Sequence, residues 1–151
     1  MGQLGSAPNA TTTVIATGSF SGLLRIYSPR QPGYNVEDLL LEMRMHAPIL
    51  SVAIGRFVPE SRVMALAVLH PRSTAVYKLS SGPDITKDAT LFKLAPSFAH
   101  PLPWPAFNMV TGTLGCGSGE HEQLCIQSMD GQLLVIDQVR GGCHIPFHAL
   151  A

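Results

Sequence analysis

The sequence has few charged residues and no excess of either sign. Ten Lys and Arg balance ten Asp and Glu, and charged residues make up 13% of the 151 residues, about half the share of an ordinary soluble domain. A chain without a basic stripe lacks the electrostatic footprint of proteins that bind nucleic acid or anionic membranes. We therefore expect neither as a partner.

The sequence also lacks cysteine pairs and long apolar runs. Its three cysteines, Cys116, Cys125 and Cys143, form no Cys-x-x-Cys pair, and an odd number argues against a disulfide-stapled secreted fold. No stretch approaches the roughly 20 apolar residues of a membrane span, and Met1–Thr13 lacks the pattern of a secretory signal. We expect a protein of the cytoplasm or nucleus, without direct membrane insertion.

Apolar residues and structure-breaking residues are plentiful instead. Hydrophobic residues reach 46%, and 14 Gly and 12 Pro are scattered along the chain. Because proline interrupts most windows of helical length, this pattern favours many short strands. The best candidate helix is Asn35–Met45, but its position before a repeated strand favours β-structure there as well.

Three stretches predict β-hairpins with the same organisation. Alternating or continuous apolar segments flank a short turn in each, at 14–20 and 23–27, at 64–70 and 74–79, and at 124–129 and 132–137. Gly22 and Gly131 are the predicted structural turn residues, since Asp130-Gly131 supplies the positive φ angles of a tight hairpin.

A second element recurs ahead of the later two hairpins. The segments 48–57 and 105–114 share a first proline, a glycine at the eighth position and matching apolar positions, at an offset of 57 residues from Pro48 to Pro105. A short apolar stretch that fits an outer strand precedes each of them, at 38–44 and at 91–94. One unit is then four strands. Residues 64–69 are apolar at every position, as in a strand whose sheet is covered on both sides.

These repeats predict an all-β fold, an incomplete β-propeller of about two to three four-stranded antiparallel blades. The partial propeller covers 14–138, with blades at about 14–44, 48–98 and 105–138, between a flexible lead-in at 1–13 and a divergent tail at 139–151. A small sandwich or an open barrel built from the same hairpins are the alternatives. Since propellers close with about four blades or more, the end sheets need neighbours.

Four stretches carry a resemblance to a known family, namely Gly18–Pro29, Glu37–Glu42, Leu66–His70 and Cys125–Gly131. They resemble the amino-terminal β-propeller of the Bardet-Biedl syndrome protein nine family, also called the parathyroid hormone-responsive protein family. The matches run in order from about Val14 to Gln138, and the pattern is lost after Gln138.

The resemblance implies a non-enzymatic scaffold, an interaction subunit of the BBSome that supports cilium assembly and the trafficking of membrane proteins to and from the cilium. It implies other BBSome subunits as partners and no small-molecule substrate. The implied locations are the cytoplasm, the cilium and the region of the ciliary basal body and centrosome.

Two clusters offer alternative chemistry. Cys116, His121, Cys125 and Cys143 could make a tetrahedral zinc site from three thiolates and one imidazole, although their spacing is not that of a compact zinc knuckle. The segment 112–119 is rich in glycine like a phosphate-binding loop, but it lacks the Gly-Lys-Ser/Thr ending and leads into a strand. A small metal-binding or hydrolytic β domain is therefore the alternative function.

No set of residues indicates a catalytic centre. Gly18–Gly22 joins two strands and is not a Gly-x-Ser-x-Gly nucleophile elbow. The six histidines are spread out, without a His-x-x-x-His pair. We expect no catalytic residue, no metal ligand and no cofactor, and hence not an enzyme.

Overall fold

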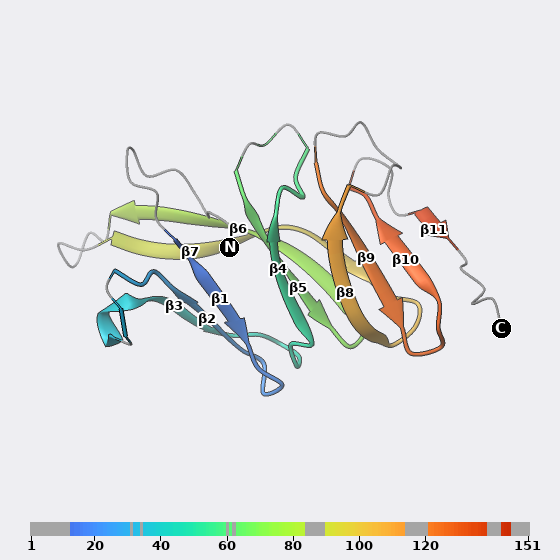
Figure 1. Ribbon diagram of the computed structural model, residues 1–151, viewed down its shortest axis with the longest axis horizontal. Helices are drawn as coiled ribbons and strands as arrows, with labels where there is room; N and C mark the ends of the chain where they lie inside the picture. Colours follow the sequence, from blue (N-terminus) through green and yellow to red (C-terminus); the bar gives the residue numbers. More distant parts are fainter. Residues whose placement is uncertain are drawn as a thin grey trace.

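The structure is a computed structural model that describes residues 13–30, 32–33, 35–59, 61, 63–83, 90–113, 121–138 and 143–145. In these residues the fold is all-β, with three antiparallel sheets. Figure 1 shows the sheets side by side, with the second between the other two. The predicted fold class and its arrangement in propeller-like blades are confirmed.

Each sheet follows the order of the chain or its reverse. The first sheet consists of β1 (Ile15–Gly18), β2 (Leu23–Tyr27) and β3 (Leu39–Arg44). The second consists of β4 (Ser51–Gly55), β5 (Ala65–His70), β6 (Ser73–Pro83) and β7 (Thr90–Pro101). The third consists of β8 (Ala106–Gly112), β9 (Gln123–Ser128), β10 (Leu133–Ile136) and β11 (Cys143–Ile145).

Glycine allows the turns of two of the hairpins. Gly22, between β1 and β2, has a φ of 81°, and Gly131, between β9 and β10, has a φ of 83°. L-residues with a side chain rarely adopt this region, whereas glycine enters it without a steric cost. The register that follows pairs Gly18 with Leu24 in the first hairpin and Gln127 with Leu133 in the other.

Strand β5 is the centre of the packing. All six of its residues are buried, and successive side chains point to opposite faces of the sheet. Leu66 and Val68 enter the core cluster that the second sheet shares with the first. Ala65, Ala67 and Leu69 enter the cluster that it shares with the third. The continuous apolar run at 64–69 therefore serves two interfaces.

Two apolar clusters hold the three sheets together. Between the first and second sheets the buried residues are Val14, Leu24, Ile26, Met45, Ile49, Leu66, Val68 and Leu79. Between the second and third sheets they are Phe57, Val58, Ala65, Ala67, Leu69, Val76, Leu102, Ala106, Met109, Leu124, Ile126 and Ile136.

The links between sheets repeat one hydrogen-bond pattern. The chain that leaves β3 donates from Ile49 N to Ser19 O, over 3.1 Å, at the turn of the first sheet. The chain that leaves β7 donates from Ala106 N to Pro71 O, over 2.8 Å, at the β5–β6 turn. Strands β1 to β3 thus correspond to β5 to β7, and the described part of the first sheet holds no counterpart of β4.

One detail differs from the sequence-based expectations. The third sheet continues past residue 138, because β11 pairs with β10 from within the segment assigned to the tail. No α-helix forms in 35–45, where the sequence favoured β-structure over the candidate helix. The Asn35 side chain accepts from Glu37 N and caps a single 3-10 turn, η1 (Val36–Asp38), and Leu39 then pairs with Tyr27. Strand pairing outweighs helix propensity there.

Removing one leucine from each face of β5 tests this arrangement. We expect Leu66→Ala and Leu69→Ala each to lower the free energy of unfolding by about 2–5 kcal/mol, because both side chains are fully buried. Phe20→Ala is the control, since that side chain is 76% exposed and its loss should change stability by less than about 0.5 kcal/mol. Urea denaturation measures all three. Equal small effects would contradict the two-sided burial.

Candidate interaction surface

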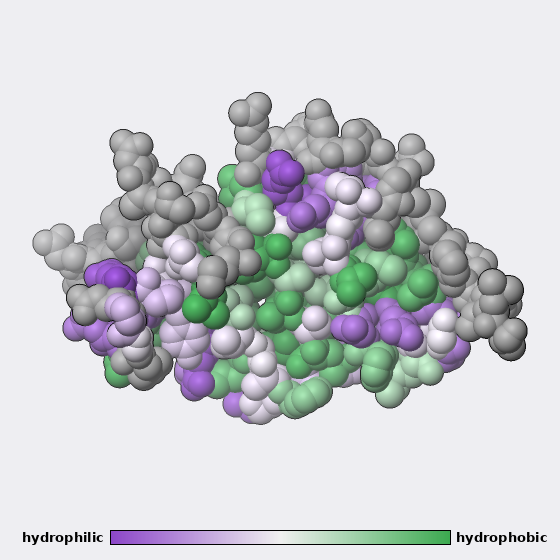
Figure 2. Space-filling model, in the orientation of Figure 1, coloured by the Kyte–Doolittle hydropathy of each residue, from purple (hydrophilic) through white to green (hydrophobic). Residues whose placement is uncertain are grey.

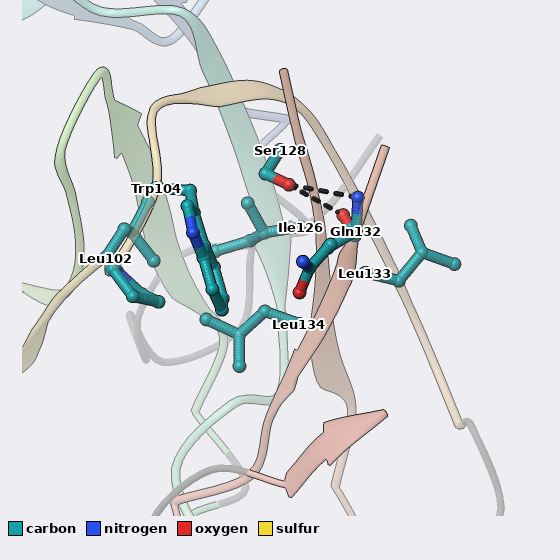
Figure 3. A pocket seen from close by; sticks show the side chains of 8 residues that line it. Leu102, Trp104, Ile126, Ser128, Gln132, Leu133 and Leu134 are labelled. Atoms are coloured by element: carbon teal, nitrogen blue, oxygen red, sulfur yellow. Dashed lines mark hydrogen bonds between the residues drawn. The ribbon is translucent and has the colours of Figure 1, made fainter. Parts of the chain in front are cut away.

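The described chain carries an apolar groove on the rim where the second sheet meets the third. We call it the rim groove. Its lining residues come from the β7–β8 link and from β9, β10 and their turn, and they are Leu102, Pro103, Trp104, Ile126, Ser128, Gln132, Leu133 and Leu134. Figure 3 shows the Trp104 ring standing between Leu102 and Ile126, with Leu134 beside its edge.

Backbone hydrogen bonds fix both walls of the rim groove. Leu102 N donates to Arg72 O over 2.9 Å, which fastens the β7–β8 link to the β5–β6 turn. Met129 N donates to Pro105 O over 2.9 Å, which fastens the β9–β10 turn to the same link. The groove is therefore built on the ends of β9 and β10 and on turns that are bonded to one another.

Apolar side chains project into solvent around the rim groove. Trp104 is 36% exposed, Phe107 on β8 is 62% exposed and Met129 in the β9–β10 turn is 71% exposed. Figure 2 shows further apolar surface over β4 and β8 in the middle of the visible face. Aromatic residues and methionine are enriched where proteins bind proteins.

The outer face of the first sheet carries both polar and apolar side chains. Arg25 alternates with buried Leu24 and Ile26, so it points outward, and its Nε lies 2.6 Å from Glu42 Oε2. Glu42 raises the pKa of Arg25, through the hydrogen bond and then through its charge. Ile15 lies on the same face, two positions from the partner of Arg25, and is 40% exposed.

The outer face of the third sheet carries exposed Val110 beside Asn108 and Gln127, which are also exposed and pair with each other. Val110 alternates with buried Met109 and is 57% exposed. Its neighbour across the register is Cys125, a half-buried free thiol whose pKa is raised by burial. Such a thiol stays protonated, so it behaves as a small apolar side chain and is a poor nucleophile.

A buried polar cluster joins the start of β9 to the end of β10. Asp137 Oδ1 lies 2.9 Å from His121 Nε2, and Gln123 Nε2 donates to Asp137 Oδ2 over 2.9 Å. All three residues are at least 94% buried. Next to them, Glu122 Oε2 accepts from Arg56 N over 2.8 Å and links the third sheet to the second.

The residues of the alternative zinc site are not brought together where the structure describes them. His121 binds Asp137, whereas Cys125 lies in the middle of β9. Cys116 and the side chain of Cys143 lie outside the described residues. Within the described part of the chain, no group of three or more His, Cys, Asp and Glu side chains could hold a metal ion.

The glycine-rich segment 112–119 is described only at Gly112 and Thr113, so most of it also lies outside the described residues. The rim groove, by contrast, was missed by the sequence reasoning. The available signal was the single tryptophan, Trp104, in a proline-rich connection between two strands. Trp104 lies in a connection between strands, where the sheets do not cover it. An exposed aromatic side chain at such a place is a candidate for contact with another protein.

A family model described as the PTHB1 N-terminal domain matches residues 2–148. The chain belongs to the PTHB1 N-terminal family. Protein PTHB1 of Xenopus laevis is 39% identical over 128 residues, and Protein PTHB1 of Homo sapiens is 39% identical over 128 residues. The Mus musculus protein of the same name is 38% identical, and each match covers 82% of this chain.

These findings correct the resemblance drawn from the sequence. The resemblance gave two names for the family. The matched family and these three relatives carry the name PTHB1, which stands for parathyroid hormone-responsive protein, and none of them carries the name Bardet-Biedl syndrome protein nine. The likeness is also wider than Val14 to Gln138, because the PTHB1 model extends to residue 148. The sequence after Gln138 departs from the pattern of the family, but the match to the family model continues through it to residue 148.

The chain spans 14–15% of the length of these relatives. Within its described residues, no helix has the length and apolarity that a membrane span requires.

The buried polar cluster gives a second stability prediction. We expect Asp137→Ala to lower the free energy of unfolding by about 3–5 kcal/mol, because it leaves two buried groups, on His121 and Gln123, without this partner. The control is Glu42→Ala, which removes an exposed ion pair and should leave the urea midpoint nearly unchanged. Similar midpoints for both variants would show that the cluster does not contribute to folding.

Proposed function

We propose that this PTHB1-family chain is a non-enzymatic scaffold, an interaction subunit of the BBSome that supports cilium assembly and the trafficking of membrane proteins to and from the cilium. Its partners are other BBSome subunits, and it acts without nucleic acid or a small-molecule substrate. It works in the cytoplasm, in the cilium and at the basal body and centrosome region.

The observation that carries the proposal is the exposed apolar surface around the rim groove. A few well-packed aromatic and apolar anchors supply most of the energy of a protein interface, and tryptophan is enriched among them. Trp104 has this form, since its ring is partly exposed while Leu102 and Ile126 support it in the groove. Loops on a rigid scaffold are also the usual place for binding residues.

The family membership supports the same proposal. A domain shared with much longer relatives, and built from stacked sheets, is suited to hold partners in fixed positions. Fold alone does not assign a function. The rim groove therefore supports the proposal, and binding to BBSome subunits tests it.

Binding to purified BBSome subunits tests the proposal. We expect Trp104→Ala and Met129→Ala to weaken binding of the 151-residue chain at least tenfold, as for hot-spot residues. Val36→Ala is the matched control, because Val36 is as exposed as Met129, at 71%, but lies in η1 on the first sheet. Circular dichroism checks that each variant is folded.

Failure of the unmodified chain to bind any BBSome subunit would refute the assignment to that assembly. Unchanged binding by both Trp104→Ala and Met129→Ala would refute the role of the rim groove and the surface around it. A tagged chain in ciliated cells, observed by fluorescence microscopy, tests the predicted location at the cilium and basal body.

A further inference from the structure

A buried histidine ends the central strand β5. His70 is 1% exposed, and its Nδ1 lies 2.8 Å from Pro48 O. A carbonyl oxygen only accepts, so Nδ1 carries the hydrogen and Nε2 of the neutral ring carries a lone pair. Nε2 is buried and has no hydrogen-bond partner among the described residues. The site fits a neutral ring, because burial penalises the charged form of His70 and its Nε2 makes no hydrogen bond there.

Pro48, which accepts the hydrogen bond from His70, lies in the link between the first and second sheets. We call residues 45–50 the linker joint. Met45 N donates to Gly22 O over 2.7 Å, Ile49 N donates to Ser19 O over 3.1 Å, and Leu50 N donates to Leu69 O over 2.8 Å. The linker joint is thus bonded to the turn of the first sheet and to the end of β5.

His46, also in the linker joint, is the titratable group beside His70. The two ring centroids are 4.6 Å apart at an interplanar angle of 55°, and His46 is exposed. From the other neighbouring elements, Ser73 of β6 pairs with His70 and is uncharged, and Arg72 lies in the adjoining turn. Burial lowers the pKa of His70, and the charge of His46 lowers it further. The backbone carbonyls of Pro48 and Ala47 raise it by less, so the pKa is lowered overall.

We propose that His70 makes the linker joint acid-sensitive, so that taking up a proton on this ring loosens the first sheet from the second while the third sheet stays in place. The proton comes from solvent and adds to Nε2. It creates a charged, unpaired N–H in an apolar site next to a second imidazole, and opening of the joint relieves this by admitting water. This property goes beyond the proposed function, since it needs no partner.

The direction of the pH effect follows from the lowered pKa of His70. The opened form binds the proton near the ordinary imidazole pKa of about 6.5, whereas the closed form binds it only at lower pH. The closed joint therefore has its full stability above about pH 6.5. It loses stability as the pH falls below that value, by up to about tenfold per pH unit, until the pKa of the buried ring is reached.

Hydrogen exchange of single amides tests the proposal on the unmodified chain. Between pH 7.5 and pH 5.0, after correction for intrinsic exchange, we expect protection of the Ile49 and Leu50 amides to fall at least tenfold. Protection of the Leu124 and Ile126 amides in β9 should change less than threefold. His70→Asn can still donate to Pro48 O but does not titrate, so in this variant the loss at Ile49 and Leu50 should disappear.

Three results would overturn the proposal. They are unchanged protection at Ile49 and Leu50 at pH 5.0, an equal loss in all three sheets, and a pH response that persists in His70→Asn. If His70→Asn does not fold, His46→Gln gives the second readout. It removes the neighbouring charge that lowers the pKa of His70, so the pKa of the closed form moves toward the ordinary value and the loss of protection at pH 5.0 should be smaller than in the unmodified chain.

Discussion

The two-sided burial of β5 is the constraint on which the rest of the structure depends. A strand that is apolar on both faces is stable only between two covering layers, and this chain supplies one from each side. Leu66 and Val68 meet the first sheet, whereas Ala65, Ala67 and Leu69 meet the third. The small residues on one face allow the third sheet to come close, and the larger residues on the other face fill the space toward the first.

Among the described residues, only the sheet in the middle has both faces covered by other sheets. The outer face of the first sheet carries the Arg25–Glu42 ion pair. The outer face of the third sheet carries exposed Val110. At the rims, linkers and turns bind one another through backbone hydrogen bonds. The same bonds position the rim groove and the linker joint. The packing of the sheets therefore determines where both features lie.

Much of the fold could be predicted from periodicity and turn chemistry. The hairpins around Gly22 and Gly131, the repeat beginning at Pro48 and Pro105, and the double burial of 64–69 depend on local signals, and the sheets follow them. Strand β11 could not be predicted, because three residues of Cys-His-Ile carry almost no alternation and pair only once β10 is in place.

The candidate sites were less accessible from the sequence. Trp104 was visible as a residue, but its groove needs side chains from β9 and β10 that are more than 20 positions away. The bond of His70 to Pro48 and the cluster around Asp137 likewise join distant segments. In each case tertiary packing brings the partners together, and no spacing along the chain marks it.

A double-mutant cycle on the free energy of unfolding tests the central role of β5 most directly. Leu66→Ala combined with Ile26→Ala should show a coupling of about 0.5–3 kcal/mol, because both side chains belong to the same cluster. Leu66→Ala combined with Ile126→Ala, which lies in the other cluster, should be additive within about 0.5 kcal/mol. Coupling of Leu66 to Ile126 without coupling to Ile26 would contradict the account.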